Sequence, residues 1–416
     1  MKTPYSDTAF YIICSLIVLA PLARGSVHPW ATTIIQACVL IALILVVIES
    51  LVSKRAVFPP SPMAKPIIAI IALSGVSALY SDHKPLAFEG FCMLLTYVVI
   101  YFITLFSTRT RQQQRTLVYI IVSTALLLAI IGILKRFGLT PSPWWIYPDV
   151  GLDHASTSVS GAYVNRNHLA GFLEMAIPLL MALFLTRQRS LEAKSGMIVL
   201  LLFLVITQAF TLSRGGWISA VAAILFMAAV LLAQKNFVHK KLVLTIGTGV
   251  IIISVFILAS TPVVQRITTL TQEDPTDNIS GRIRCWKGVV GLIKDNPMTG
   301  TGPNTFTAAY PAYQIPGDAI LRRFAHNDYL HFISATGIMF VPVMLYSLFC
   351  FFRAGFDSLK SRSRQTRGFT LGAMAAVFAI LVHSFSDFNL NIPANALLFT
   401  VILTLVPIPS VVEVRP

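Results

Sequence analysis

The sequence predicts an all-α polytopic membrane protein that forms one integral membrane domain over residues 1–416. Hydrophobic residues make up 56% of the 416 residues and charged residues only 12%, whereas soluble domains contain roughly 25% charged residues. The apolar residues lie in long runs, and about 20 consecutive apolar residues cross a bilayer as a helix. Basic residues also alternate between successive loops, as multi-pass membrane proteins require.

Apolar runs of about 15 to 24 residues predict twelve transmembrane helices. They are expected near residues 8–23, 31–51, 66–80, 86–106, 116–135, 168–186, 196–212, 216–234, 242–260, 329–352, 369–388 and 393–410. The third and the last runs are short, so these helices could be tilted or partly re-entrant. The first run lacks a clean cleavage site of small residues, so we expect a retained span rather than a cleaved signal peptide.

Lysine and arginine predict which side of the membrane each loop faces. Loops 52–65, 107–115, 187–195, 235–241 and 353–367 hold 3, 3, 3, 3 and 5 of these residues, and loops 24–30, 81–85 and 389–392 hold one, one and none. Positive charge favours the cytoplasmic side in short loops. We therefore expect both termini in the cytoplasm and the segments 136–167 and 261–328 on the outer side.

The net charge of +15 does not indicate a nucleic-acid partner, because the basic residues form no contiguous face and no nucleic-acid motif. Membrane lipids with anionic headgroups are the expected partners. The five cysteines show no metal-ligand spacing, and four of them lie in apolar runs. Neither a disulfide framework nor a zinc site is predicted.

The segment 261–328 is expected to be a large outer loop between helices nine and ten. Ser280 is a candidate N-cap, and apolar residues recur at helical spacing over 282–294. This pattern predicts an amphipathic helix in the outer interface. GTGPNTF at 300–306 is a glycine-rich turn without the flanking elements of a nucleotide-binding fingerprint.

The stretch FAHNDYLHFISATG at 324–337 closes this loop. Asn327 and Asp328 are N-cap residue types, so we expect the tenth helix to begin there with His326 at its mouth. A titratable histidine below a loop rich in arginine indicates a site that handles an anionic, membrane-borne substrate.

Other polar residues gather at the same side of the membrane. Asn165, Arg166 and Asn167 could hold a polar headgroup or only cap the sixth helix. Arg214 lies beside two glycines that let the backbone pass close to a bound group, although an arginine at the membrane edge can also simply snorkel. Glu174 lies inside the sixth helix, where we expect an ion pair with an outer arginine rather than catalysis.

Together these motifs resemble the O-antigen ligase/polymerase superfamily of bacterial envelope glycan assembly. The matching pieces are GAYVNRNHLAGFLEMAIPL, TLSRGGW, SGRIRCW, NPMTGTGPNTF, HNDYLHFISATG and HSFSDFNLNIPAN. The resemblance covers residues 160–395, and the first five helices match only in hydropathy.

The resemblance implies a glycosyltransferase of the GT-C type in the bacterial inner membrane, with its active site and large loop facing the periplasm. Such an enzyme moves a glycan from an undecaprenyl diphosphate carrier to an acceptor hydroxyl without a cofactor. The family's catalytic residues correspond to Arg214, His326 and Arg282, with Arg284 as the alternative to Arg282. Further substrate contacts are expected from Arg284, Asn165, Asn167, Asn327 and Arg166.

The residue types fit this chemistry. A polyprenyl diphosphate is already a good leaving group, so two guanidinium groups suffice to stabilise its growing charge. A histidine with a pKa near ~6.5 can deprotonate or orient the acceptor hydroxyl. The outer loop has no paired carboxylates and no metal-ligand cluster, so we expect metal independence.

Several functions remain open at this point. The acceptor is the lipid A–core in a ligase and a second lipid-linked glycan in an O-antigen or exopolysaccharide polymerase, and the shared motifs do not report it. A transporter with twelve helices is less favoured because the chain has no evident half-to-half repeat. A flippase or envelope scaffold is also less favoured, because the polar groups cluster at one end instead of along a transbilayer path.

Overall fold

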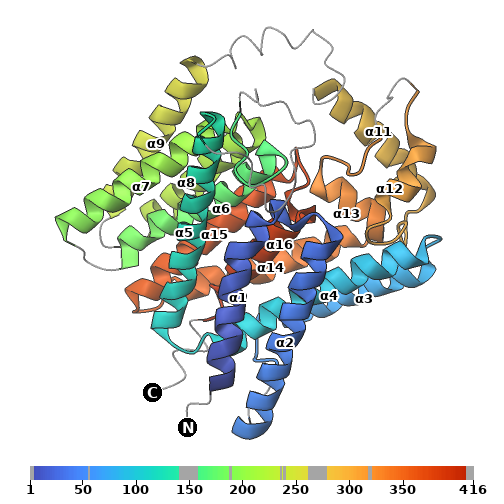
Figure 1. Ribbon diagram of the computed structural model, residues 1–416, viewed down its shortest axis with the longest axis horizontal. Helices are drawn as coiled ribbons and strands as arrows, with labels where there is room; N and C mark the ends of the chain where they lie inside the picture. Colours follow the sequence, from blue (N-terminus) through green and yellow to red (C-terminus); the bar gives the residue numbers. More distant parts are fainter. Residues whose placement is uncertain are drawn as a thin grey trace.

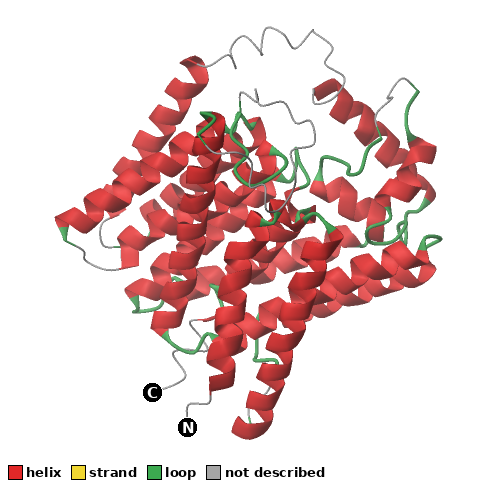
Figure 2. Cartoon of the chain, in the orientation of Figure 1, coloured by secondary structure: helices red, strands yellow, loops and turns green. Residues whose placement is uncertain are grey.

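Helices are the only regular elements among the residues that the computed structural model describes (Figure 2). The described ranges are 4–54, 57–139, 158–186, 190–234, 237, 240–260, 279–316 and 321–408. The all-α prediction is confirmed for this part of the chain.

Nine helices of the described residues are long and apolar enough to cross a membrane, which supports a polytopic membrane protein. They are α1 (Pro4–Leu22), α2 (Pro29–Ser53), α4 (Lys84–Ser107), α5 (Arg111–Arg136), α6 (Arg166–Thr186), α7 (Leu191–Phe210), α8 (Arg214–Ala233), α14 (Phe340–Ser358) and α15 (Arg364–His383). α9 (Lys240–Ser260) occupies the expected ninth span, while α3 (Ala64–Tyr80) and α16 (Pro393–Thr404) are apolar but shorter. The expected number of twelve is therefore not confirmed.

α6 and α15 form the centre of the bundle (Figure 1). Most residues of both helices are buried. α15 carries small residues toward α6, where Gly372 lies against Ala182. In a membrane, small residues let helix backbones approach closely and gain packing contacts. Polar side chains at this contact are therefore shielded from lipid.

The continuous tenth span expected over 329–352 is wrong, because the chain breaks there into two helices. α13 (Asp328–Thr336) ends before Gly337, whose φ of 83° only glycine adopts without strain, and α14 begins at Phe340. The turn at 297–302 packs into the break: the Ile338 N–H donates to the Pro297 carbonyl over 2.8 Å. The N–H groups of Thr301 and Gly302 likewise donate to the carbonyls of Ser334 and Ala335, each over 2.9 Å. These three bonds replace the helical ones that a continuous span would make.

α11 (Ile279–Asp295) begins earlier than the range 282–294, so Ser280 lies in its first turn rather than at its N-cap. Its inner side packs into a small core of the outer loop, formed by Cys285, Val289, Phe306, Tyr310 and Ala325. Ile283 and Val290, two of the apolar residues that recur at helical spacing, remain 42% and 41% exposed. The helix therefore has a packed face and an opposite face of mixed apolar and lysine residues.

The outer-loop elements gather at one end of the molecule, away from the beginning of α1 and the end of α2 (Figure 1). The remaining short helices are η1 (Arg24–Ser26), α12 (Phe306–Ala309), η2 (Tyr310–Tyr313) and η3 (Asn389–Asn391).

The exposed face of α11 permits a test of the expected topology. Cys285 is buried, so its native thiol is a poor probe. In a protein without the five native cysteines, we expect Val290→Cys to react with a membrane-impermeant maleimide on intact spheroplasts, because the loop should face the periplasm. Lys360→Cys, in a loop with many basic residues, is the matched control and should react only after permeabilisation. The reverse pattern would contradict the topology.

Candidate functional site

Motifs that are far apart in the sequence meet at the turn after α15. We call this turn, residues 384–391, the outer corner; it contains η3 and leads into α16. The beginnings of α6, α8 and α13, together with one side of α11, contact it through hydrogen bonds or close packing.

Asp328 attaches α13 to the outer corner. Its Oδ2 accepts hydrogen bonds from Ser384 Oγ (2.8 Å) and the Leu390 N–H (3.2 Å), and its Oδ1 accepts one from Asn391 Nδ2 (2.7 Å). Burial raises the pKa of Asp328 from 3.8 to about 7, although the bonds from Ser384 and Leu390 oppose this shift. Both oxygens of this side chain therefore serve to hold the corner.

Asn327 and Tyr329, on either side of Asp328, add to this attachment. Asn327 Oδ1 accepts from the Leu330 N–H over 3.0 Å and so caps α13, as its residue type predicts, while its Nδ2 donates to the Phe385 carbonyl over 3.0 Å. The Tyr329 hydroxyl donates to the Leu381 carbonyl over 2.6 Å. The capping residue is thus Asn327 and not His326.

His326 is held in a defined position just before α13. Its φ of 50° is left-handed, which costs a non-glycine residue about 1–3 kcal/mol and persists only where the surroundings enforce it. Its ring meets the Phe388 ring edge-on, with centroids 4.9 Å apart. On the other side, Trp286 Nε1 donates to the carbonyl of Ala325 over 2.9 Å, so α11 fixes the preceding residue.

Arg214 is the exposed first residue of α8, and Ser213 caps that helix by accepting from the Gly216 N–H over 3.2 Å. Gly215 lies against the end of α15: a Cβ there would be 2.5 Å from Ser386 Oγ and 2.6 Å from the His383 ring. We expected the glycine pair to approach a bound group, but Gly215 approaches protein atoms. Because Gly215 packs against Ser386, the backbone of the adjacent Arg214 lies beside the outer corner.

Arg282 reaches the same place from α11, where its Nη1 donates to the Ser386 carbonyl. Residues two positions apart on a helix point about 200° apart. Arg284 therefore leaves the other side of α11. Of the two candidate loop arginines, Arg282 is the one at the outer corner.

Two asparagines around the beginning of α6 connect that helix to the outer corner. Asn165 Oδ1 accepts from the Asn167 N–H over 2.8 Å, and Asn167 Nδ2 donates to buried Asp387 Oδ2. Burial opposes ionisation of Asp387, but the charges of His168 and Arg282 hold its pKa below the usual value.

The structure thus brings Arg214, Arg282 and His326 to the outer corner. The other residues expected to contact substrate do not all lie there with free polar groups. Asn165, Asn167 and Asn327 are engaged by protein atoms. Arg166 is the half-buried first residue of α6, and Arg284 lies away from the corner. Their roles as substrate ligands remain predictions.

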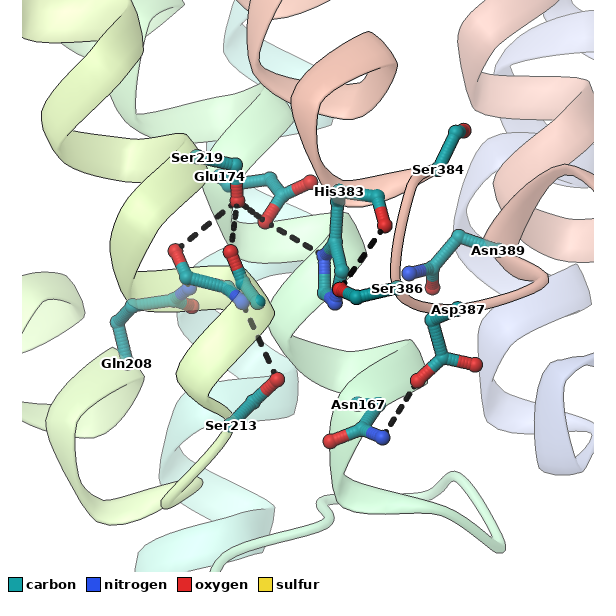
Figure 3. Close-up of polar contacts among 12 residues, drawn as sticks. Asn167, Glu174, Gln208, Ser213, Ser219, His383, Ser384, Ser386, Asp387 and Asn389 are labelled. Atoms are coloured by element: carbon teal, nitrogen blue, oxygen red, sulfur yellow. Dashed lines mark hydrogen bonds and ion pairs between the residues drawn. The ribbon is translucent and has the colours of Figure 1, made fainter. Parts of the chain in front are cut away.

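The partner expected for Glu174 is wrong. Glu174 Oε2 lies 2.9 Å from His383 Nδ1 and 2.7 Å from Ser219 Oγ, in the buried contact of α6, α8 and α15 (Figure 3). The sequence holds one signal for this pair: two ionisable residues within apolar runs, each of which needs a partner in lipid. Among the described residues, no group of three or more His, Cys, Asp or Glu side chains could hold a metal ion.

The O-antigen ligase family model matches residues 196–341. The match supports the O-antigen ligase/polymerase superfamily. The matched segment contains Arg214, Arg282 and His326, whereas Glu174 and His383 lie outside it. No curated protein matches the chain. The O-antigen ligase match and the apolar helices together support a multi-pass membrane protein that transfers glycans.

The pKa of Asp328 predicts how stability depends on pH. Between about pH 4 and pH 7 the Asp328 carboxyl binds its proton more tightly in the folded protein than in the unfolded chain. The contribution of this carboxyl to the free energy of unfolding therefore decreases as pH rises and is lost above that window. We expect the Tm of the purified protein to fall across this range, and Asp328→Asn to show a smaller fall. Asp357→Asn, which removes an exposed carboxylate, should keep the wild-type slope. Equal slopes in wild type and Asp328→Asn would contradict this assignment.

Proposed function

We propose that the protein is a GT-C-type glycosyltransferase of the bacterial inner membrane. It moves a glycan from an undecaprenyl diphosphate carrier to a hydroxyl of the lipid A–core at the periplasmic face. The observation that carries this proposal is the meeting of two arginines and a histidine, from three separate segments, at the outer corner.

Arg214 and Arg282 bind the diphosphate of the donor. Guanidinium groups match phosphate oxygens with paired N–H donors, and such charge-assisted bonds are stronger than neutral ones. The N-terminal end of α8, from which Arg214 projects, adds backbone N–H groups and a positive dipole end. As the glycosidic bond breaks, negative charge grows on the diphosphate, and both arginines stabilise it.

His326 acts on the acceptor. The acceptor oxygen attacks the anomeric carbon of the donor, the bond from that carbon to the diphosphate oxygen breaks, and the hydroxyl proton passes to the His326 imidazole. Imidazole is the side chain best suited to accept such a proton near neutral pH.

Within this proposal the protein is a ligase, which uses the lipid A–core as acceptor. The alternative is an O-antigen or exopolysaccharide polymerase, in which a second lipid-linked glycan is the acceptor. Transfer to each acceptor in separate reactions distinguishes the two.

Substitution of the arginines tests the donor site. We expect Arg214→Ala and Arg282→Ala to lower glycan transfer by the purified protein about 10²–10³-fold, as for loss of an oxyanion donor. Lys287→Ala is the matched control, because Lys287 is an exposed basic residue five positions along the same helix, and it should stay close to wild type. Full activity of Arg214→Ala in a folded protein would contradict the proposal.

Substitution of His326 tests the acceptor site. His326→Ala should lose about 10²–10⁴-fold in turnover yet still bind the lipid-linked donor. Because Asn327 already caps α13, His326→Asn should not restore turnover. Rescue by asparagine, which cannot take a proton at neutral pH, would refute the role of general base. Loss of donor binding would instead make His326 a ligand of the diphosphate.

A further inference from the structure

We propose that the buried Glu174–His383 pair is a positioning unit that sets the spacing between Arg214 and Arg282, and so makes the site selective for a diphosphate over a monophosphate. This inference rests on the proposed function.

The pair lies where three helices meet just below the outer corner. Glu174 projects from α6 and is 0% exposed; His383 is the last residue of α15 and is 1% exposed. Their side chains meet at 2.9 Å between Oε2 and Nδ1 (Figure 3).

One arm of this unit leads to Arg214. Ser219, one turn into α8, places its Oγ 2.7 Å from Glu174 Oε2 and 2.6 Å from the Gly215 carbonyl oxygen. The Gly216 carbonyl oxygen also lies 3.2 Å from this hydroxyl, so Ser219 links Glu174 to the first turn of α8. The His383 ring also packs directly against Gly215. The first turn of α8, and with it the base of Arg214, is therefore seated on the pair.

The other arm leads to Arg282. The N–H of Ser386 donates to the His383 carbonyl over 2.8 Å, and its Oγ donates to the same carbonyl over 3.2 Å. The carbonyl of Ser386 in turn accepts from Arg282 Nη1. His383 thus holds the residue that receives Arg282.

Stability alone does not account for the pair. Buried ion pairs often contribute no more than apolar residues of the same size, because desolvation offsets their attraction. Glu174 Oε1 also has no hydrogen-bond partner among the described residues. An arrangement that is costly in a membrane and links both arginines indicates a geometric role.

Spacing matters only for a ligand with two phosphoryl groups. A diphosphate can engage both arginines at once if their separation matches, whereas a monophosphate needs one. A shift of one arginine relative to the other therefore weakens diphosphate binding and leaves monophosphate binding nearly unchanged.

The test measures the affinity of the full-length protein, in detergent, for undecaprenyl diphosphate and undecaprenyl monophosphate. We expect Glu174→Leu to weaken diphosphate binding roughly tenfold or more, the value of one charge-assisted contact, with little change for the monophosphate. Glu174→Gln, which can still bond both His383 and Ser219, should retain most of the preference. Ser219→Ala removes only the hydrogen bond between α8 and Glu174 and should lower the preference for the diphosphate severalfold. This variant tests the inference if Glu174→Leu does not fold.

Glu49→Leu is the matched control, because Glu49 is also buried in an apolar helix and forms an ion pair, with 2.7 Å between its Oε1 and Arg109 Nη2. It lies near the end of α2 that is distant from the outer corner (Figure 1) and should keep the wild-type preference. A folded Glu174→Leu protein that keeps its diphosphate preference, or loses both ligands equally, would overturn the inference. A wild-type protein without any diphosphate preference would instead overturn the proposed function.

Discussion

The outer corner depends on one buried carboxylate. Asp328 accepts three hydrogen bonds from the turn after α15, and its own N–H donates to the carbonyls of Ser384 (2.9 Å) and Asp387 (3.1 Å). A turn between two membrane helices exposes backbone donors and acceptors that lipid cannot satisfy. Because α13 supplies these partners, the turn, α13 and the His326 segment that precedes it form one unit.

The other functional side chains are positioned by reference to that unit. Gly215 brings the beginning of α8 against Ser386, and Arg282 donates to the carbonyl of the same residue. Arg214 is thus placed through the backbone of the neighbouring Gly215, whereas Arg282 contacts the corner with its guanidinium group. Both contacts fall on Ser386, so this one residue relates the position of α8 to that of the Arg282 guanidinium.

Sequence-based expectations succeeded where the signal is local and failed where a distant segment intervenes. The start of α13 at Asp328 follows from the N-cap type of Asn327. The break at Gly337 does not follow from local hydropathy, because the turn at 297–302 fills it from outside. Glu174 could be recognised as needing a partner, but the choice of His383 over an arginine depends on the close approach of α6 and α15.

The sequence by itself determined that this chain is helical and has many apolar helices, and it predicted that the segments with the arginines and His326 lie on one side of a membrane. Hydropathy, capping residues and the charge of short loops are properties of neighbouring residues, so they can be read along the chain. Only the tertiary structure decided that Arg282 rather than Arg284 meets the outer corner, and that Glu174 pairs with His383. The reason is that helix rotation and the packing of small residues between helices set these contacts, and both depend on segments distant in the sequence.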